Sequence, residues 1–146
     1  MMLHKLRAGL RLSRQERTIL ARAWARLLVA DLLLRFLPLP RVQKLLAARP
    51  RRRGGETATA PTLRVLRAVD VAARHHLYPM HCLQRALVLQ SMLGTYGVHT
   101  DLRLGVRREA GELRAHAWIE HQGQPLGESA DVQREFSPLA GAGEGE

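Results

Sequence analysis

The chain is poor in cysteine and in aromatic residues. Cys82 is the one cysteine among 146 residues, so an internal disulfide is excluded. With two Trp, two Tyr and two Phe, the core must come mainly from Leu, Val and Ala, and the hydrophobic content of 46% is high enough for that. This length suits one domain with a hydrophobic core and is too short for two ordinary ones. We therefore expect a single domain over residues 1–146.

The chain also lacks an uninterrupted hydrophobic run. Its most apolar stretch, residues 19–37, is broken by Arg22, Arg26, Asp31 and Arg35, whereas a membrane-spanning helix needs about 20 predominantly apolar residues. The basic stretch that precedes it, and the charges within it, do not fit a secretory signal peptide. We expect no membrane span and a cytoplasmic location.

Acidic side chains are scarce in the first third of the chain. Residues 1–53 carry two Lys and twelve Arg against Glu16 and Asp31, a balance of +12, while residues 54–146 have a balance of −2. Such a segment can meet nucleic acid, an anionic membrane or an acidic protein. The excess of Arg over Lys also fits a general arginine bias. No helix-turn-helix or aromatic platform accompanies the charge, so a nucleic-acid-binding protein is the least favoured reading.

The first sixty residues are predicted to form a basic helical extension. Ser13 followed by Glu16 is a capping-box pattern, and apolar residues then recur at helical spacing to about residue 35. Two prolines stop this helix. A short helical piece over 41–48 and an exposed loop over 49–61 follow.

Residues 61–139 are predicted to form the core, and two helices open it. The first runs from about residue 62, with Pro61 suited to a first helical position, and Tyr78-Pro79 ends it. Its predicted apolar face consists of Leu63, Leu66, Val69, Ala73 and Leu77. The second runs over about 82–93, with Cys82 in its first turn and two glycines as its stop.

Beyond residue 97 the hydrophobic period changes to two. Strands are predicted over about 98–106 and 113–120, and a third begins after Gly123. Helices followed by antiparallel strands indicate an α+β fold. The glycine-rich residues 140–146 are expected to be a flexible tail.

Cys82 is a candidate nucleophile because of its position. A thiol at a helix N-terminus faces unpaired backbone N–H groups and the positive end of the helix dipole, and both favour the thiolate. A histidine close by can take the proton and later deliver it to the leaving amine, while a third group orients the imidazole.

His116 and Glu128 suit the roles of base and orienter in one strand register. If residues 121–123 form a three-residue loop with Gly123 in the left-handed conformation, His116 faces Glu128 across the hairpin. A two-residue turn would instead pair Glu128 with Ala117, on the wrong face, and Asp131 would become the substitute.

Each of these residues also has a plainer interpretation. A lone cysteine is often an inert, buried small hydrophobe. His116 could be a hydrogen-bonded sheet residue, and Glu128 could be a solvated charge. Trp118 is expected to be a packing residue that could also wall a site beside His116.

Four residues near the predicted nucleophile invite a zinc interpretation. They are His75, His76, His81 and Cys82. Their spacing matches no common structural zinc site, and no second Cys/His pair follows. We therefore predict no metal and no cofactor.

Four short segments carry a resemblance to a known family. They are CLQRAL at 82–87, LRLGV at 102–106, AHAWIE at 115–120 and GESADV at 127–132. In order and spacing they resemble the transglutaminase-like leader peptidases of lasso-peptide biosynthesis, over roughly residues 60–139.

The resemblance implies a papain-like or transglutaminase-like cysteine protease that acts in the maturation of a ribosomally made peptide. Such an enzyme removes the leader from a lasso precursor peptide, so that a macrolactam cyclase can act on the freed amine. By this match Cys82 is the nucleophile and His116 the general base and acid. The third member, usually Asp, falls at Glu128, with Asp131 in reserve.

The family occurs fused to a leader-recognition domain or split from it. Residues 1–60 read as helix and loop, so we expect the split form, which needs a separate leader-binding protein. The basic N-terminal helix is a candidate docking surface. The N–H of Cys82 is an expected oxyanion donor, and Gln84 is not. A catalytically inactive adaptor on the same fold remains the alternative.

Overall fold

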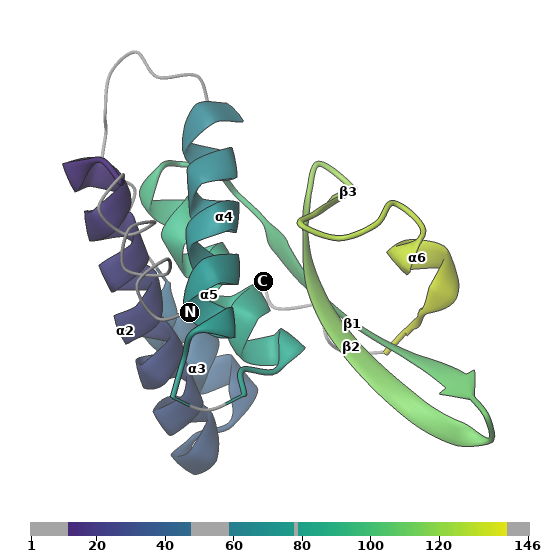
Figure 1. The fold of residues 1–146 in the computed structure, drawn as a ribbon. Helices are drawn as coiled ribbons and strands as arrows, with labels where there is room; N and C mark the ends of the chain where they lie inside the picture. The colour runs from purple at the N-terminus through teal and green to yellow at the C-terminus, as the bar shows by residue number, and fades with distance from the viewer. Residues whose placement is uncertain (1–11, 48–58, 78, 140–146) are drawn as a thin grey trace, which may run out of the picture.

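The chain folds as helices followed by a sheet (Figure 1). The computed structural model describes residues 12–47, 59–77 and 79–139. Its helices are α2 (Arg14–Phe36), α3 (Leu39–Leu46), α4 (Thr59–Arg74), α5 (Cys82–Thr95) and α6 (Val132–Glu135), and its strands are β1 (Asp101–Glu109), β2 (Glu112–His121), β3 (Gln124–Leu126) and β4 (Ser137–Pro138). The predicted α+β class is confirmed. Most of the predicted loop over 49–61 and all of the predicted tail over 140–146 lie outside the described residues.

Helix α2 begins at the predicted capping box. The backbone N–H of Ser13 donates to Glu16 Oε2 at 2.8 Å, and the N–H of Glu16 donates to Ser13 Oγ at 3.2 Å. These hydrogen bonds hold the pKa of Glu16 below its usual value. The face of α2 that enters the core carries Ile19, Ala23, Leu27 and Ala30. Within the described residues, no helix has the length and apolar character that crossing a bilayer requires.

The apolar face predicted for α4 is only partly right, because Val69 is buried and Ala73 packs against the core while two of its leucines are exposed. Leu63 is 58% exposed and Leu77, which lies beyond the end of the helix at Arg74, is 72% exposed. Besides Val69, α4 buries Val65, Ala68 and Ala72, which the predicted face did not include. Because α4 packs against both α2 and α5, small residues on this side let two helices approach it, and Leu63 and Leu77 are left outside.

Helix α5 agrees with its prediction to within two residues. It begins at Cys82, with His81 as its N-cap. At its other end Gly97 adopts φ +77°, where the N–H of Gly97 reaches the carbonyl of Gly94 and that of Val98 reaches Leu93. A left-handed glycine closes a helix in this way because it has no Cβ to clash.

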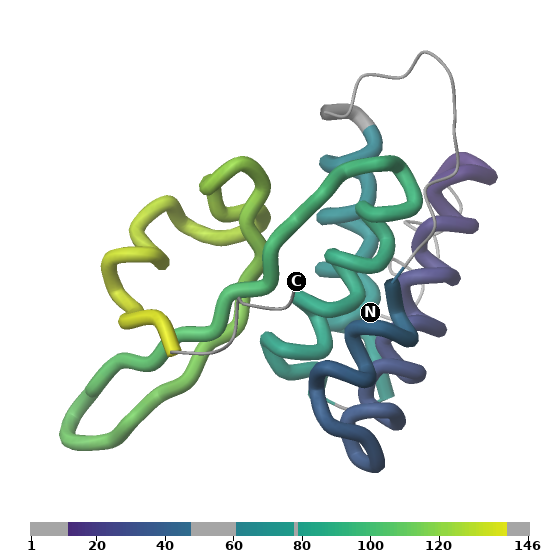
Figure 2. Tube along the Cα trace, turned by 180° about the vertical axis from the view of Figure 1, so that it is seen from behind, coloured from purple at the N-terminus to yellow at the C-terminus, as the bar shows by residue number. Residues whose placement is uncertain are grey.

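The sheet packs on the main helices with one face and on the single turn α6 with the other. Its strand order is β3-β2-β1-β4, and β1 and β2 form a hairpin that extends away from the helices (Figure 2). One face of the hairpin, with Leu102, Ala117 and Ile119, joins the main helical core. On the other face Trp118 packs with Val132 and Phe136, the two ends of the α6 segment. The strand predicted over 98–106 begins only at Asp101.

The turn between β2 and β3 corrects the predicted register. His121 pairs with Gln124 and Ile119 with Leu126, so the turn has two residues and not three. Gln122 and Gly123 have φ of 51° and 78°, as in a type I′ turn, whose twist matches that of the flanking strands. The prediction of a three-residue loop was therefore wrong, and the route by which Glu128 was expected to reach His116 does not exist.

Candidate active site

A small cleft of about 90 Å³ lies between the start of α5 and the strand β2. Helix α5 lines it with Cys82, Arg85, Ala86 and Leu89, and β2 lines it with residues 116–119. Leu126 at the end of β3, and Gly127 and Glu128 directly after it, complete the lining. Three residues singled out in the sequence, Cys82, His116 and Glu128, thus come from three separate segments to one cleft.

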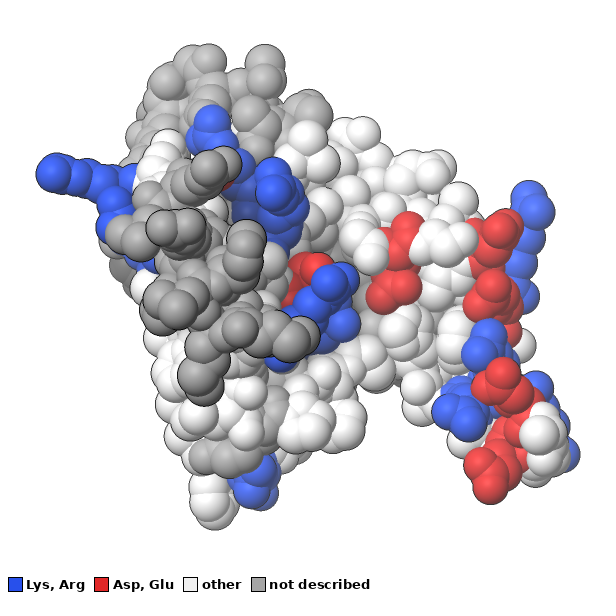
Figure 3. All heavy atoms as spheres, in the orientation of Figure 1, with Lys and Arg blue, Asp and Glu red and all other residues white. Residues whose placement is uncertain are grey.

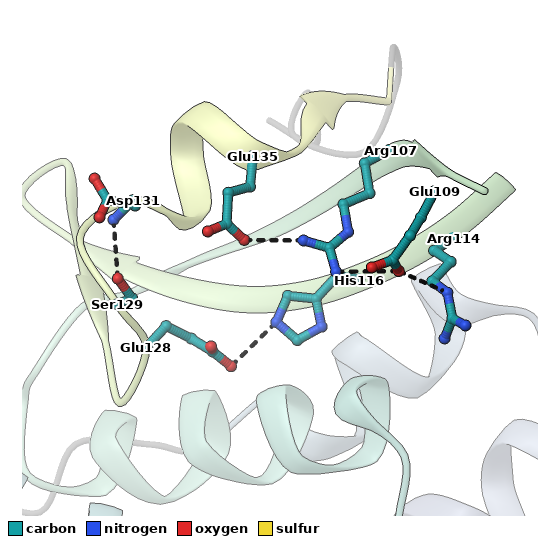
Figure 4. A network of polar contacts seen from close by, with 8 residues as sticks. All are labelled: Arg107, Glu109, Arg114, His116, Glu128, Ser129, Asp131 and Glu135. Carbon is teal, nitrogen blue, oxygen red and sulfur yellow. Dashed lines mark hydrogen bonds and ion pairs between the residues drawn. The ribbon is translucent and has the colours of Figure 1, made fainter. Parts of the chain in front are cut away.

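His116 and Glu128 are in direct contact. His116 Nε2 lies 3.1 Å from Glu128 Oε1, and the two side chains point toward one another (Figure 4). Their side chains are 23% and 36% exposed, so the pair sits at the mouth of the cleft and is open to water. In the tautomer whose Nε2–H donates to this carboxylate, Nδ1 is the ring nitrogen that can accept a proton.

Gly127 explains why Glu128 reaches His116 in spite of the two-residue turn. β3 ends at Leu126, and Gly127 adopts φ +72°. A Cβ on Gly127 would also lie 3.2 Å from Leu66 Cδ2, so the position favours glycine for space and for conformation. The chain turns out of the ladder here, and a count of strand pairs does not carry past Leu126.

Asp131, the reserve candidate, lies away from the imidazole (Figure 4). It is the N-cap of α6, its backbone N–H donates to Ser129 Oγ at 3.2 Å, and its carboxylate lies 3.9 Å from Arg134. Its side chain is 66% exposed. The structure therefore brings Glu128, and not Asp131, to His116.

Aromatic rings form the wall behind His116. The ring of Phe136 lies 5.1 Å from the imidazole and that of Trp118 lies 6.0 Å from it, centroid to centroid. A Cβ on Gly105, opposite His116 in the ladder, would come within 2.8 Å of Phe136 Cβ and 3.0 Å of the Trp118 ring. The sequence placed Trp118 beside His116 but missed Phe136, because only the pairing of β4 with β1 brings that residue there.

Polar contacts tie the start of α5 to the other helices. Gln84 is buried, and its amide Nε2 donates to Asp31 Oδ1 on α2 at 3.1 Å. Arg85, at the cleft, donates to Asp70 Oδ1 on α4 at 2.9 Å. Each contact joins residues more than ten positions apart, so no local pattern revealed it. No side chain of the described residues caps α5, which leaves the first-turn N–H groups unpaired within the helix.

Glu120 of β2 accepts hydrogen bonds from three side chains next to the aromatic cluster. It is buried, and its carboxylate accepts from Trp118 Nε1 at 2.9 Å, Gln133 Nε2 at 2.8 Å and Arg103 Nε at 3.1 Å. Burial alone would raise its pKa, but these three donors outweigh it and hold the pKa below the usual 4.5. Glu120 is therefore a charged, hydrogen-bonded residue that helps to hold β2, the strand on which His116 lies.

The residues that suggested zinc have other places in the fold. His76 stacks on Trp24 of α2 with centroids 4.6 Å apart, and His81 is the N-cap residue of α5, where its side chain makes no capping hydrogen bond. Over 12–47, 59–77 and 79–139 there is no group of three or more His, Cys, Asp or Glu side chains placed to hold a metal ion.

Comparison with known families decides where this arrangement belongs. A family model described as the transglutaminase-like superfamily matches residues 24–141. The chain belongs to the transglutaminase-like superfamily. The matched region begins within α2, includes α3, α4 and α5, and continues through the sheet and α6. Searches of curated proteins and of solved structures return no match. Membership of the transglutaminase-like superfamily is consistent with a cysteine peptidase fold.

Proposed function

We propose that this transglutaminase-like protein is a cysteine peptidase that removes the leader from a ribosomally made lasso precursor. In this proposal it acts with a separate leader-binding protein and before a macrolactam-forming cyclase. The substrate and partners come from the resemblance of four segments at 82–132 to such leader peptidases. The observation that supports the chemistry is the cleft that Cys82, His116 and Glu128 share.

In the first half of the reaction His116 Nδ1 takes the proton of the Cys82 thiol. The sulfur then attacks the carbonyl carbon of the scissile peptide bond. Glu128 holds Nε2–H, which fixes the ring orientation and stabilises the imidazolium. The proton passes from Nδ1 to the leaving amine as the C–N bond breaks, and the leader's acyl group remains on the sulfur.

In the second half water replaces the amine. Nδ1 takes a proton from the water, the hydroxide attacks the thioester, and the sulfur leaves with the proton returned to it. Both halves pass through an oxyanion, and unpaired N–H groups at the start of α5 are suitable donors for it. The freed amine begins the mature peptide.

Alkylation of the single cysteine tests the proposal. The wild-type protein is mixed with a lasso precursor peptide and the leader-binding protein of the same biosynthetic system, and products are followed by mass spectrometry. We expect cleavage at one peptide bond, and we expect iodoacetamide to add one group at Cys82 and to stop cleavage. If the untreated protein left the precursor intact, and if alkylation did not change how tightly it binds the precursor, the protein would be an adaptor. That result would contradict the peptidase proposal.

Glu128→Gln should lower kcat for precursor cleavage about a hundredfold, because the amide no longer stabilises the imidazolium that forms at His116. Asp131→Asn is the matched control and should stay within about twofold of wild type, since Asp131 lies away from the ring. Steady-state cleavage kinetics measure both. If Asp131→Asn lost activity and Glu128→Gln kept it, the assigned orienter would be wrong.

A further inference from the structure

The outer edge of β2 is open beside the cleft. Strand β3 covers this edge only at residues 119–121, where it pairs with β2 through residues 124–126. β2 itself extends back to Glu112. Among the described residues, no strand pairs with residues 112–118 on this side, since the order of the sheet places β1 on the other side.

The turn at the tip of the hairpin determines which backbone groups face this edge. Ala110 and Gly111 form a two-residue turn, so Glu109 and Glu112 form a hydrogen-bonded pair. Hydrogen-bonded and non-hydrogen-bonded pairs alternate along an antiparallel ladder. The N–H and C=O groups of Leu113, Ala115 and Ala117 therefore point away from β1, as do those of Ile119, which pairs with β3.

The open edge leads into the cleft. Leu113 and Ala115 are exposed, Ala115 directly precedes His116, and Ala117 lines the cleft. Apart from ladder bonds, no backbone hydrogen bond from Leu113 or Ala115 is found among the described residues. β3 leaves this edge at Gly127. Among the described residues, therefore, no strand continues β3 along β2 beyond the pair that Ile119 forms with Leu126.

The free end of the hairpin is charged, whereas Leu113 and Ala115, whose backbone groups face the open edge, carry no charge. Arg108, Glu109, Glu112 and Arg114 are all exposed there, and side chains of both signs gather at this end of the molecule (Figure 3). Charges at the end of an edge strand discourage pairing with arbitrary strands. Leu113 and Ala115 carry no such charge, so an extended peptide that continues into the cleft meets no charge at these two positions.

We propose that the substrate peptide binds as an added strand on this edge, hydrogen-bonded to the backbone of Leu113 and Ala115. This inference rests on the proposed peptidase function and adds how the substrate is held. Strand addition uses main-chain hydrogen bonds for affinity. At about 3.3 Å per residue, the paired segment lies within about four residues of the scissile bond.

Amide hydrogen exchange tests the contact directly. NMR is used on the Cys82→Ala protein with the uncleaved precursor peptide and the leader-binding protein present. We expect the amides of Leu113 and Ala115 to become protected when the precursor is added. The amides of Arg114 and His116, which already face β1, should change little. Exchange at Leu113 and Ala115 that is the same with and without the precursor would overturn the proposal.

A scan of single N-methyl groups along the precursor gives a second measurement. Strand pairing predicts that every second methylated amide near the scissile bond weakens binding about tenfold, since each loses one hydrogen bond and blocks the edge. Ala115→Pro should weaken binding similarly because it removes the outward N–H, while Ala115→Val keeps that N–H and is the control. A scan without a period of two would contradict strand addition. If Ala115→Pro does not fold, the exchange measurement and the scan still decide.

Two further outcomes separate this inference from related ones. Protection of Leu113 and Ala115 without peptide, together with a dimer in sedimentation, would mean that a second copy occupies the edge and would overturn the proposal. Period-two binding by the Cys82→Ala protein, with no cleavage by wild type, would support the edge and refute the peptidase. Cleavage by wild type without period-two binding would refute the edge alone.

Discussion

Cys82→Ala is expected to abolish leader removal, and His116→Ala is expected to lower kcat/KM for it by at least about a thousandfold. Without the thiol no acyl-enzyme can form, and without the imidazole nothing in the cleft takes and returns the proton. Cys82 and His116 line the same cleft from α5 and β2. Quantitative mass spectrometry of the precursor, with a long incubation for the slow variants, measures both losses.

His121→Ala is the matched control for the histidine. It lies on the same strand, its Nδ1 contacts the carbonyl of His99 at 2.7 Å, and it does not line the cleft. We expect its kcat/KM to stay within about threefold of wild type. Thermal unfolding of all three variants checks that their folds persist. Cleavage by His116→Ala at the rate of His121→Ala would show that the imidazole is not the base.

Glu120→Ala is expected to lower the free energy of unfolding by about 3 kcal/mol. Removing a buried carboxylate leaves its buried donors unpaired, and each such group costs about 1–3 kcal/mol. The donors concerned are Trp118 Nε1 and Gln133 Nε2. Arg103 contributes less because its side chain is 45% exposed and can bind water instead. Urea unfolding measures the change.

Glu112→Ala is the control on the same strand, since Glu112 is exposed. It should change stability by less than about 0.5 kcal/mol. The two variants should also differ in acid. The folded pKa of Glu120 lies below the usual 4.5, so its contribution is present above pH 4.5 and is lost as pH falls through the lowered pKa. Wild type should lose this part of its stability there, and Glu120→Ala should not. Equal acid sensitivity would contradict the assignment.

Local patterns were enough to predict the longer helices and the first three strands, whereas α6 and β4 were not predicted. The capping box at Ser13 and Glu16 determines where α2 begins, because its two hydrogen bonds form within a single turn. The glycine at residue 97 ends α5 for an equally local reason. Alternation of period two found the β1–β2 hairpin, although the start of the first strand was placed three residues early.

Predictions that depended on neighbouring elements were less successful. The buried face of α4 is set by α2 and α5 together, and apolar periodicity alone selected the buried Val69 but also Leu63 and Leu77, which remain exposed. The predicted register after β2 was wrong because the sequence around Gln122 and Gly123 is compatible with both a two-residue and a three-residue turn. Phe136 was missed because its contact with His116 crosses 20 positions.

The sequence by itself determined that the single cysteine opens a helix and that His116 lies on a strand, since both are consequences of local periodicity and capping. Only the tertiary structure decided that Cys82 shares a cleft with His116 and that Glu128, not Asp131, contacts the ring. The physical reason lies in Gly127. Its left-handed conformation, set tightly against Leu66, ends the ladder and turns Glu128 toward the imidazole, which no count of strand pairs can anticipate.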